Sequence, residues 1–239
     1  MSFQMAPSCQ LALKSRLKLM SCPRCLKNES LCVCELIKPI FNKINVLILQ
    51  HPQEPDKDLG SARLANLCLS NSTLKIGLSW PNLSKVLGRA SQPSRWAVMY
   101  LGSGIKSTEK IPPGLYFVNK KGELLQEKPD HPTDPVEGIV VLDGTWSQAK
   151  TLWWRNPWLL KLRRAIIVPS RPSLYRNLRR EPRRECLSTI ETVAEALALL
   201  GEDGQTAANL KLVFEKLLKK VKHPEAPAFR PLGASPRHA

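Results

Sequence analysis

Four cysteines lie close together near the N-terminus, in an arrangement that suits a metal ion. They form two pairs, Cys22 with Cys25 and Cys32 with Cys34, in a C-x2-C-x6-C-x-C pattern. Each pair can converge from one tight turn, and four thiolates suit a tetrahedral zinc ion. No neighbouring residue is suited to hold an activated water, so such a site would be structural. We therefore expect structural zinc, with redox-active thiols, buried core cysteines and an iron–sulfur cluster as open alternatives.

A second group of polar residues follows an apolar stretch in the middle of the chain. Residues 140–142 lead into Asp143, Gly144, Thr145 and Trp146, which stand where a helix is expected to begin. An acid at the end of a strand is a candidate catalytic or binding group. Alternatively, Asp143 or Thr145 caps the helix by accepting its free N–H groups. The residues by themselves leave both interpretations open.

Two further loops combine small and polar residues where a strand ends or a helix begins. The first contains Leu101, Gly102 and Ser103, and the second contains Ser188, Thr189 and Glu191. A glycine after a strand lets the backbone approach a ligand closely, although it can equally mark a simple turn. In the second loop we expect Ser188 or Thr189 to cap the helix, alongside any contact with a ligand.

His51 is a secondary candidate for proton transfer. It follows a buried apolar run and precedes Pro52, which fixes the turn, but a lone histidine in such a place is often structural. The glycine spacings of a dinucleotide site and of a P-loop do not occur, so neither nicotinamide nor a P-loop nucleotide is indicated.

The remaining cysteines and clustered tryptophans are expected to pack in the core. They are Cys9, Cys68, Cys186, Trp153, Trp154 and Trp158.

The net charge of +16 points to an anionic partner. More than half of it, +9, falls between Lys150 and Ser188. The densest part carries five arginines, namely Arg176, Arg179, Arg180, Arg183 and Arg184. Guanidinium groups suit bidentate contacts with phosphates, so we expect this segment to bind nucleic acid, with a solvated loop that serves solubility as the alternative. Charge alone does not separate RNA from DNA.

The elements that position these loops alternate between short apolar runs and helix-like stretches, which is typical of an α/β fold with a mainly parallel sheet. Expected strands cover residues 44–50, 74–78, 97–101, 115–118, 138–142 and 165–168. Expected helices cover residues 59–69, 83–87, 146–155, 189–200 and 207–222. Because ligands bind at the carboxyl ends of parallel strands, the loops described above are the places to expect chemistry.

The length of 239 residues is enough to bury a full core, and 43% hydrophobic residues exclude global disorder. We expect an N-terminal segment with the zinc module at 1–39, a catalytic domain at 40–222 and a disordered tail at 223–239. The longest apolar stretches are well short of the roughly 20 residues of a membrane span, so no membrane is expected. The N-terminus lacks the pattern of a secretory signal, which predicts a cytoplasmic protein with reduced thiols.

The segment Asp143-Gly144-Thr145-Trp146 resembles the D-x-T-W motif of the DTW-domain family. The likeness extends to the cysteine cluster and to residues 50–54, 175–179 and 187–191. Members of this family are known as tRNA-uridine aminocarboxypropyltransferases, which move the 3-amino-3-carboxypropyl group of S-adenosylmethionine to N3 of uridine. The family is related to the SPOUT class, whose α/β domain carries a C-terminal trefoil knot that binds the cofactor. The resemblance therefore implies this fold, this co-substrate and tRNA, and not DNA, as the partner.

The resemblance also implies roles for single residues. Asp143 would be either the general base for N3 or an electrostatic anchor for the ammonium or sulfonium of the co-substrate. The implied cofactor contacts are Leu101, Gly102, Ser103, Asp143, Gly144, Thr145, Trp146, Ser188, Thr189 and Glu191. One departure lies at Ser61, where many members carry a threonine ahead of a basic residue. The alternatives are an RNA-binding zinc protein without catalysis and a SPOUT-type RNA methyltransferase.

Overall fold

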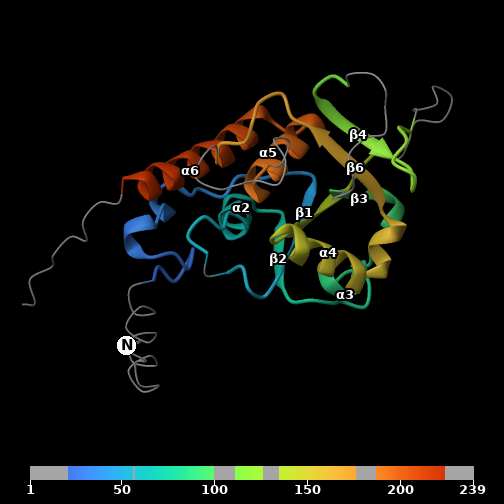
Figure 1. The fold of residues 1–239 in the computed structure, drawn as a ribbon, viewed down its shortest axis with the longest axis horizontal. Helices are drawn as coiled ribbons and strands as arrows, with labels where there is room; N and C mark the ends of the chain where they lie inside the picture. The colour runs from blue at the N-terminus through green and yellow to red at the C-terminus, as the bar shows by residue number, and fades with distance from the viewer. Residues whose placement is uncertain (1–20, 56, 100–110, 126–134, 176–186, 224–239) are drawn as a thin grey trace, which may run out of the picture.

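A six-stranded sheet forms the centre of the computed structural model, which describes residues 21–55, 57–99, 111–125, 135–175 and 187–223. The strands follow the order β2-β1-β5-β3-β6-β4 (Figure 1). They are β1 (Asn45–Gln50), β2 (Ser72–Ile76), β3 (Trp96–Met99), β4 (Gly114–Val118), β5 (Gly138–Asp143) and β6 (Arg163–Val168). All neighbours pair in parallel except β4, which pairs antiparallel with β6 at one edge. The expected α/β class with a mainly parallel sheet is confirmed.

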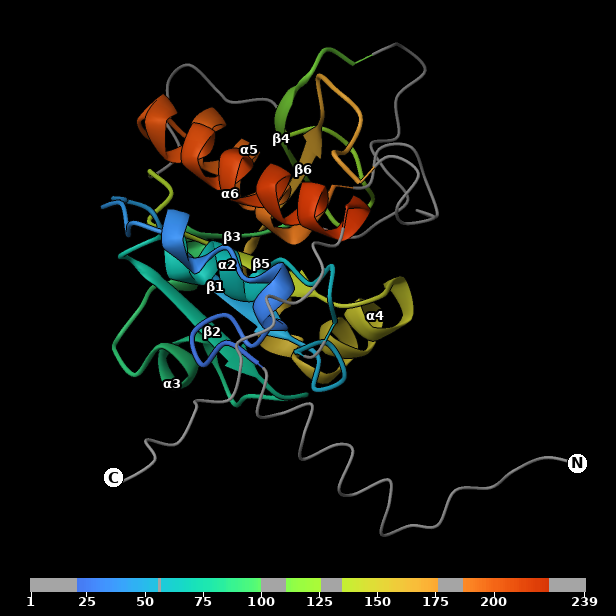
Figure 2. The same ribbon diagram turned by 90° about the vertical axis from the view of Figure 1, so that its left-hand side faces the viewer.

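Helices cover both faces of this sheet (Figure 2). They are α2 (Ala62–Cys68), α3 (Leu83–Leu87), α4 (Trp146–Arg155), α5 (Thr189–Leu199) and α6 (Gly204–Lys222). Alternate residues of the central strands divide between two cores. Val46 and Ile48 of β1 pack with α2, α5 and α6, whereas Leu47 and Leu49 pack with α3 and α4. Burial on both faces explains why β1 and β5 are almost uninterrupted apolar runs.

The N-terminal cysteine segment packs onto the α6 side of the sheet. Its short 3-10 helices are η1 (Glu29–Leu31) and η2 (Cys34–Leu36), and two more follow later in the chain, η3 (Pro93–Arg95) and η4 (Pro157–Lys161). Cys25 and Val33 are buried in the same core as α6, and Lys220 of α6 donates to the carbonyl of Cys32 at 2.7 Å. No described helix combines the length and the apolarity that a membrane crossing needs. The trefoil knot remains a prediction, because residues 100–110 and 176–186 lie outside the described part of the chain.

Two helices begin at other residues than expected. α2 begins at Ala62 instead of residue 59, because the N–H of Gly60 closes a turn onto Lys57 and the carbonyl of Leu59 accepts from a distant tyrosine. α6 begins three residues earlier than expected, because Asp203 caps it. The expectation for Trp154 is wrong: its side chain is 78% exposed, since α4 buries only the face that carries Ala149 and Leu152.

Gly138 makes room for the buried ring of Trp96 on the neighbouring strand, where the two residues are paired in register. A Cβ at this position would meet the indole at 2.6 Å. We expect Gly138→Ala to lower the free energy of unfolding by about 1–3 kcal/mol, because the ring has no space to move. Gly204→Ala is the matched control: nothing lies within 4 Å of its added methyl group, and the change should stabilise α6 by about 0.5 kcal/mol. Urea denaturation measures both, and equal stability of the two variants would contradict this packing.

Candidate functional site

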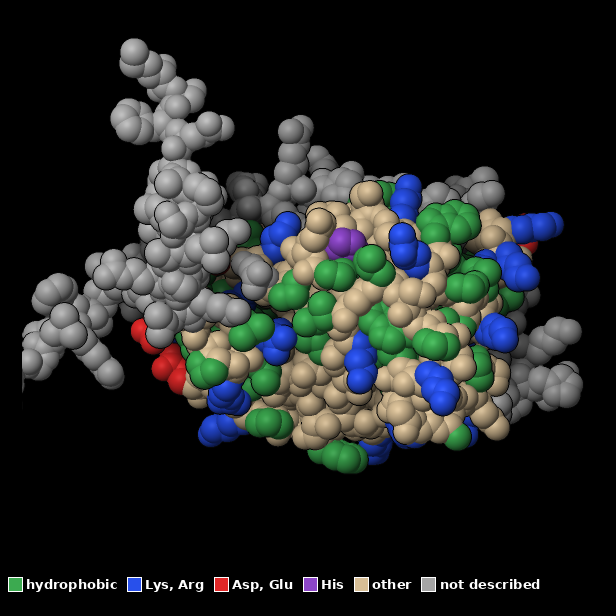
Figure 3. Space-filling view, turned by 90° about the horizontal axis from the view of Figure 1, so that it is seen from below, with side chains coloured by type: hydrophobic (Ala, Val, Ile, Leu, Met, Phe, Trp, Pro, Cys, Tyr) green, Lys and Arg blue, Asp and Glu red, His purple; other side chains and the backbone are tan. Residues whose placement is uncertain are grey.

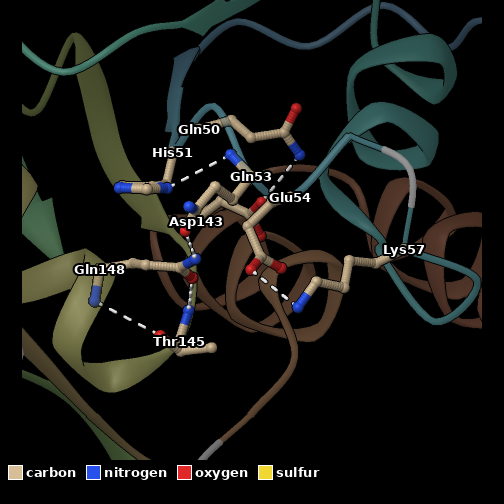
Figure 4. A network of polar contacts seen from close by, with 8 residues as sticks. All are labelled: Gln50, His51, Gln53, Glu54, Lys57, Asp143, Thr145 and Gln148. Atoms are coloured by element: carbon tan, nitrogen blue, oxygen red, sulfur yellow. Dashed lines mark hydrogen bonds and ion pairs between the residues drawn. The ribbon is translucent and has the colours of Figure 1, made fainter. Parts of the chain in front are cut away.

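Asp143 lies at the carboxyl end of β5, directly beside Gln50 at the end of β1. Asp143 is 7% exposed, and its carboxylate accepts side-chain hydrogen bonds from Gln50, as Figure 4 shows, and from Thr189. The amide of Gln50 donates to Oδ2 at 2.9 Å, and the hydroxyl of Thr189 donates to Oδ1 through a short hydrogen bond. Both hydrogen bonds stabilise the ionised carboxylate. The structure therefore brings Asp143 and Thr189, two of the predicted site residues, into direct contact.

Thr145 caps α4, so the capping interpretation applies to Thr145 and not to Asp143. Its hydroxyl accepts from the N–H of Gln148, and the side chain of Gln148 accepts from the N–H of Thr145 at 2.6 Å. Gly144 is required by this capping box, because a Cβ there would approach Cβ of Gln148 to 2.8 Å. Trp146 then begins the helix, half-buried, with the ammonium of Lys150 at 5.6 Å from its ring.

Ser188 caps α5, as expected from the sequence, and forms a second capping box with Glu191. The carboxylate of Glu191 also accepts from the N–H of Leu174 at 2.7 Å and from the hydroxyl of Ser173 at 2.8 Å. Both oxygens of this buried acid are therefore engaged by the protein itself. Contacts of Ser188 and Glu191 with a cofactor remain predictions, and their visible role is to position Thr189 next to Asp143.

Ser61 fulfils a structural role at the position where the sequence departs from the family pattern. Its buried hydroxyl accepts from the N–H of Ile190 at 3.2 Å, in the first turn of α5. The start of α2 is thus held against the start of α5. A serine hydroxyl is sufficient for this contact.

His51 begins a loop that runs to Gly60 at the same edge of the sheet. Its backbone N–H donates to the carbonyl of Asp143 at 2.9 Å. Its Nδ1 accepts from the N–H of Gln53 at 3.3 Å, so in the neutral ring the proton lies on Nε2. This geometry disfavours His51 as the proton acceptor, and its catalytic role remains a prediction.

Lys27 connects the cysteine segment to this loop, a role that the sequence did not reveal. Its buried ammonium donates to the carbonyls of Lys57 at 3.1 Å and Asp58 at 2.7 Å. Burial lowers the pKa of Lys27 to about 8, although the negative charges of Cys25, Asp58 and Asp143 oppose the shift. A single lysine between cysteines looks like a solvated residue in sequence, because only the tertiary fold places carbonyls around it.

Tyr175 also stabilises the loop that begins at His51 and ends at Gly60. The hydroxyl of Tyr175 donates to the carbonyl of Leu59 at 2.8 Å. Its ring packs edge-on against Phe214 of α6, with 5.1 Å between the centroids. The loop from His51 to Gly60 therefore depends on contacts from α6 as well as from the cysteine segment.

The four clustered cysteines form a site of the right size for one metal ion. Their sulfur atoms all lie within 4.8 Å of one another, with Cys22 and Cys34 at 3.7 Å and Cys25 and Cys32 at 3.9 Å. A tetrahedral ion with metal–sulfur bonds of about 2.3 Å has sulfur–sulfur edges of about 3.8 Å. Burial alone would raise the pKa of Cys22, but the N–H groups of Cys25 and Arg24 lower it to about 7, which favours the thiolate that a metal needs.

Several residues with predicted roles lie outside the described part of the chain. They are the cofactor candidates Leu101, Gly102 and Ser103, the arginines Arg176, Arg179, Arg180, Arg183 and Arg184, and the isolated Cys9 and Cys186. Cys68 is described and packs in the core as expected, where burial raises the pKa of its thiol to about 12.

A known protein family matches a range of the chain that contains both the D-G-T-W loop and the cysteine cluster. The model of the DTW domain matches residues 19–222, a range that includes both features. The chain belongs to the DTW domain family. It is also similar to a curated tRNA-uridine aminocarboxypropyltransferase 2 from Macaca fascicularis, with 28% identity over 181 residues that cover 75% of this chain.

The proteins of the same name from Mus musculus and Drosophila melanogaster are 28% and 27% identical over 184 and 183 residues, again 75% of this chain. The matched region makes up 56% of the macaque and mouse proteins and 66% of the fly protein. This DTW-family chain thus spans little more than half the length of the first two relatives. No solved structure matches it.

A metal in the four-cysteine site is testable by removing one ligand. We expect the purified protein to carry about one metal ion per chain, and Cys32→Ala to lose it, because three thiolates no longer close a tetrahedral site. Cys68→Ala is the matched control, since it also removes a thiol but Cys68 is a core residue outside the group of four clustered cysteines. Inductively coupled plasma mass spectrometry measures the content. A metal-free wild type, or equal metal in both variants, would overturn the assignment.

Proposed function

We propose that this DTW-family protein transfers the 3-amino-3-carboxypropyl group of S-adenosylmethionine to N3 of a uridine in tRNA. The observation that carries the proposal is the buried carboxylate of Asp143, held by Gln50 and Thr189 in the D-G-T-W loop. Family membership and the names of the curated relatives support the reaction type. With tRNA as its substrate, the enzyme would act in the cytoplasm.

S-adenosylmethionine would supply the transferred group and, through its sulfonium, methylthioadenosine as the leaving group. N3 of uracil would form the new bond to the Cγ carbon as the carbon–sulfur bond breaks, and the proton of N3 would pass to solvent water. Of the two predicted roles of Asp143, we propose the electrostatic one. Its hydrogen bonds from Gln50 and Thr189 stabilise the ionised carboxylate, which makes it a weaker proton acceptor. A buried negative charge attracts the cationic end of the co-substrate.

The remaining predicted contacts belong to the same proposal. The loops with Leu101, Gly102 and Ser103, and with Gly144, Thr145 and Trp146, would surround the co-substrate in a SPOUT-like knot. Zinc would hold Cys22, Cys25, Cys32 and Cys34 together as a structural ion. The sulfur spacing described above supports a single ion, because a cluster of several irons would hold its cysteines farther apart.

A basic surface supports tRNA as the partner. Figure 3 shows Lys and Arg side chains spread over the underside of the molecule, with acidic groups visible only toward its edges. Exposed cations on β2, α3 and α4 are Lys75, Lys85, Lys150 and Arg155. The exposed ring of Trp154 lies on the same helix as the last two, and exposed aromatic rings can stack on unpaired bases.

The role of Asp143 is tested with unmodified tRNA and S-adenosylmethionine labelled in its methionine carbon chain. We expect Asp143→Asn to reduce the transfer of label about a hundredfold or more, because the amide keeps the shape and removes the charge. Ser147→Ala, an exposed change in the same loop region, should retain full activity. Mass spectrometry of the tRNA identifies the adduct. A methyl adduct would support the methyltransferase alternative, and unlabelled tRNA from folded wild-type protein would overturn the proposal.

The arginine segment is tested through the salt dependence of tRNA binding. We expect replacement of Arg179, Arg180, Arg183 and Arg184 by glutamine to weaken binding. The slope of log affinity against log salt should fall by about 0.7–0.9 for each phosphate that the variant no longer neutralises. Affinity for S-adenosylhomocysteine should not change. An unchanged slope would show that these arginines do not bind phosphates.

A further inference from the structure

Two buried oxygen atoms beside Asp143 have no hydrogen-bond donor within the described residues. They are Oε1 of Gln50 and Oε1 of Glu54, whose residues are 2% and 5% exposed. Buried acceptors are normally paired, because leaving one without a donor costs free energy. Two such atoms at the same edge of the sheet indicate that donors arrive with a ligand.

The orientation of the Gln50 amide is fixed by its neighbour. Its NH2 group donates to the carboxylate of Asp143, and turning the amide over would place two acceptors against each other. The carbonyl oxygen of Gln50 therefore has to point away from Asp143, as Figure 4 shows. Asp143 therefore orients the oxygen of Gln50, a hydrogen-bond acceptor, and also contributes a negative charge.

Glu54 is a buried acid with a weak partner. Its Oε1 lies 3.5 Å from the ammonium of Lys57, whose side chain is 53% exposed. Strong charge-assisted hydrogen bonds are shorter, about 2.7–2.9 Å, and a solvated lysine contributes little to such a pair. The carboxylate of Glu54 thus retains most of its capacity to bind a second cation.

The backbone holds Glu54 in place. Its N–H donates to the carbonyl of His51 at 3.0 Å, and its own carbonyl accepts from the N–H of Lys57 at 3.2 Å. The hydrogen bonds of Lys27 and Tyr175 to the following residues fasten the same loop from outside. The acceptors are therefore preorganised, which reduces the cost of ordering them around a ligand.

The chemistry of the ligand follows from these acceptors. A carboxylate and an amide oxygen suit an ammonium group, which carries a positive charge and three N–H donors. A sulfonium has no N–H donor to offer, and uracil N3–H is flanked by two carbonyl oxygens that a carboxylate would repel. We propose that Glu54 binds the α-ammonium group of the aminocarboxypropyl donor, and that the oriented oxygen of Gln50 accepts a hydrogen bond from the same ligand. This assignment rests on the proposed function and makes the two residues determinants of specificity for an amino-acid-bearing co-substrate.

The test compares two ligands that differ in the amino-acid part. S-adenosylhomocysteine carries the ammonium, whereas methylthioadenosine lacks it. By isothermal titration calorimetry, we expect Glu54→Gln to weaken binding of S-adenosylhomocysteine roughly tenfold to a hundredfold, and to leave methylthioadenosine unaffected. Glu54→Asp retains the charge and should lose less. Glu195→Gln, which removes a carboxylate from an ion pair between α5 and α6, is the matched control and should change neither affinity.

The other outcomes are equally informative. Equal weakening of both ligands would make Glu54 a structural residue and overturn the inference. Unchanged binding of S-adenosylhomocysteine by the Glu54→Gln variant would also overturn the inference. If that variant kept its affinity for S-adenosylhomocysteine but lost transfer rate, Glu54 would act at the uracil instead. Thermal unfolding checks that each variant is folded. A folded wild type that binds neither ligand would contradict the proposed function itself and not only the role of Glu54.

Discussion

The hydrogen bond between Gln50 and Asp143 is the interaction on which the candidate site depends. It forms because β1 and β5 pair in parallel and end at the same register position. Thr189 adds the start of α5 to the same carboxylate, so one buried charge joins three elements that are distant in sequence. A slip of one residue between the two strands would turn one of these side chains to the opposite face of the sheet.

Hydrogen bonds connect the cysteine segment to the loop beside Asp143 and to α6. Lys27 lies between the two cysteine pairs and binds the carbonyls of the loop that carries Glu54, while Lys220 of α6 binds the carbonyl of Cys32. A metal that fixes the cysteines therefore fixes Lys27 and, through it, the loop beside Asp143. The match to the DTW domain, over residues 19–222, covers both the cysteine segment and the D-G-T-W loop.

The fold was predictable where local pattern decides structure. Strands buried on both faces are apolar runs, the spacing of four cysteines determines that they meet, and Ser188 with Glu191 has the composition of a capping box. Tertiary contacts decided the rest. Trp154 is exposed because its helix packs on one face only, and the surroundings of Lys27 come from a loop some thirty residues away. The role of Gln50 depends on an amide orientation that no sequence pattern encodes.

The distribution of charge suits both proposed partners, which carry opposite charges. A surface that binds tRNA must be positive, whereas a sulfonium co-substrate with an ammonium group is itself a cation. At physiological salt, charges separated by more than about 8 Å are largely screened in solvent, but buried groups interact over greater distances. Buried Asp143 and Glu54 can therefore attract a cation locally beneath a basic exterior. Lys57 is largely solvated and contributes little, and although the buried ammonium of Lys27 also attracts Asp143, two buried carboxylates face this single buried cation, so this edge of the sheet keeps the negative character that a cationic donor requires.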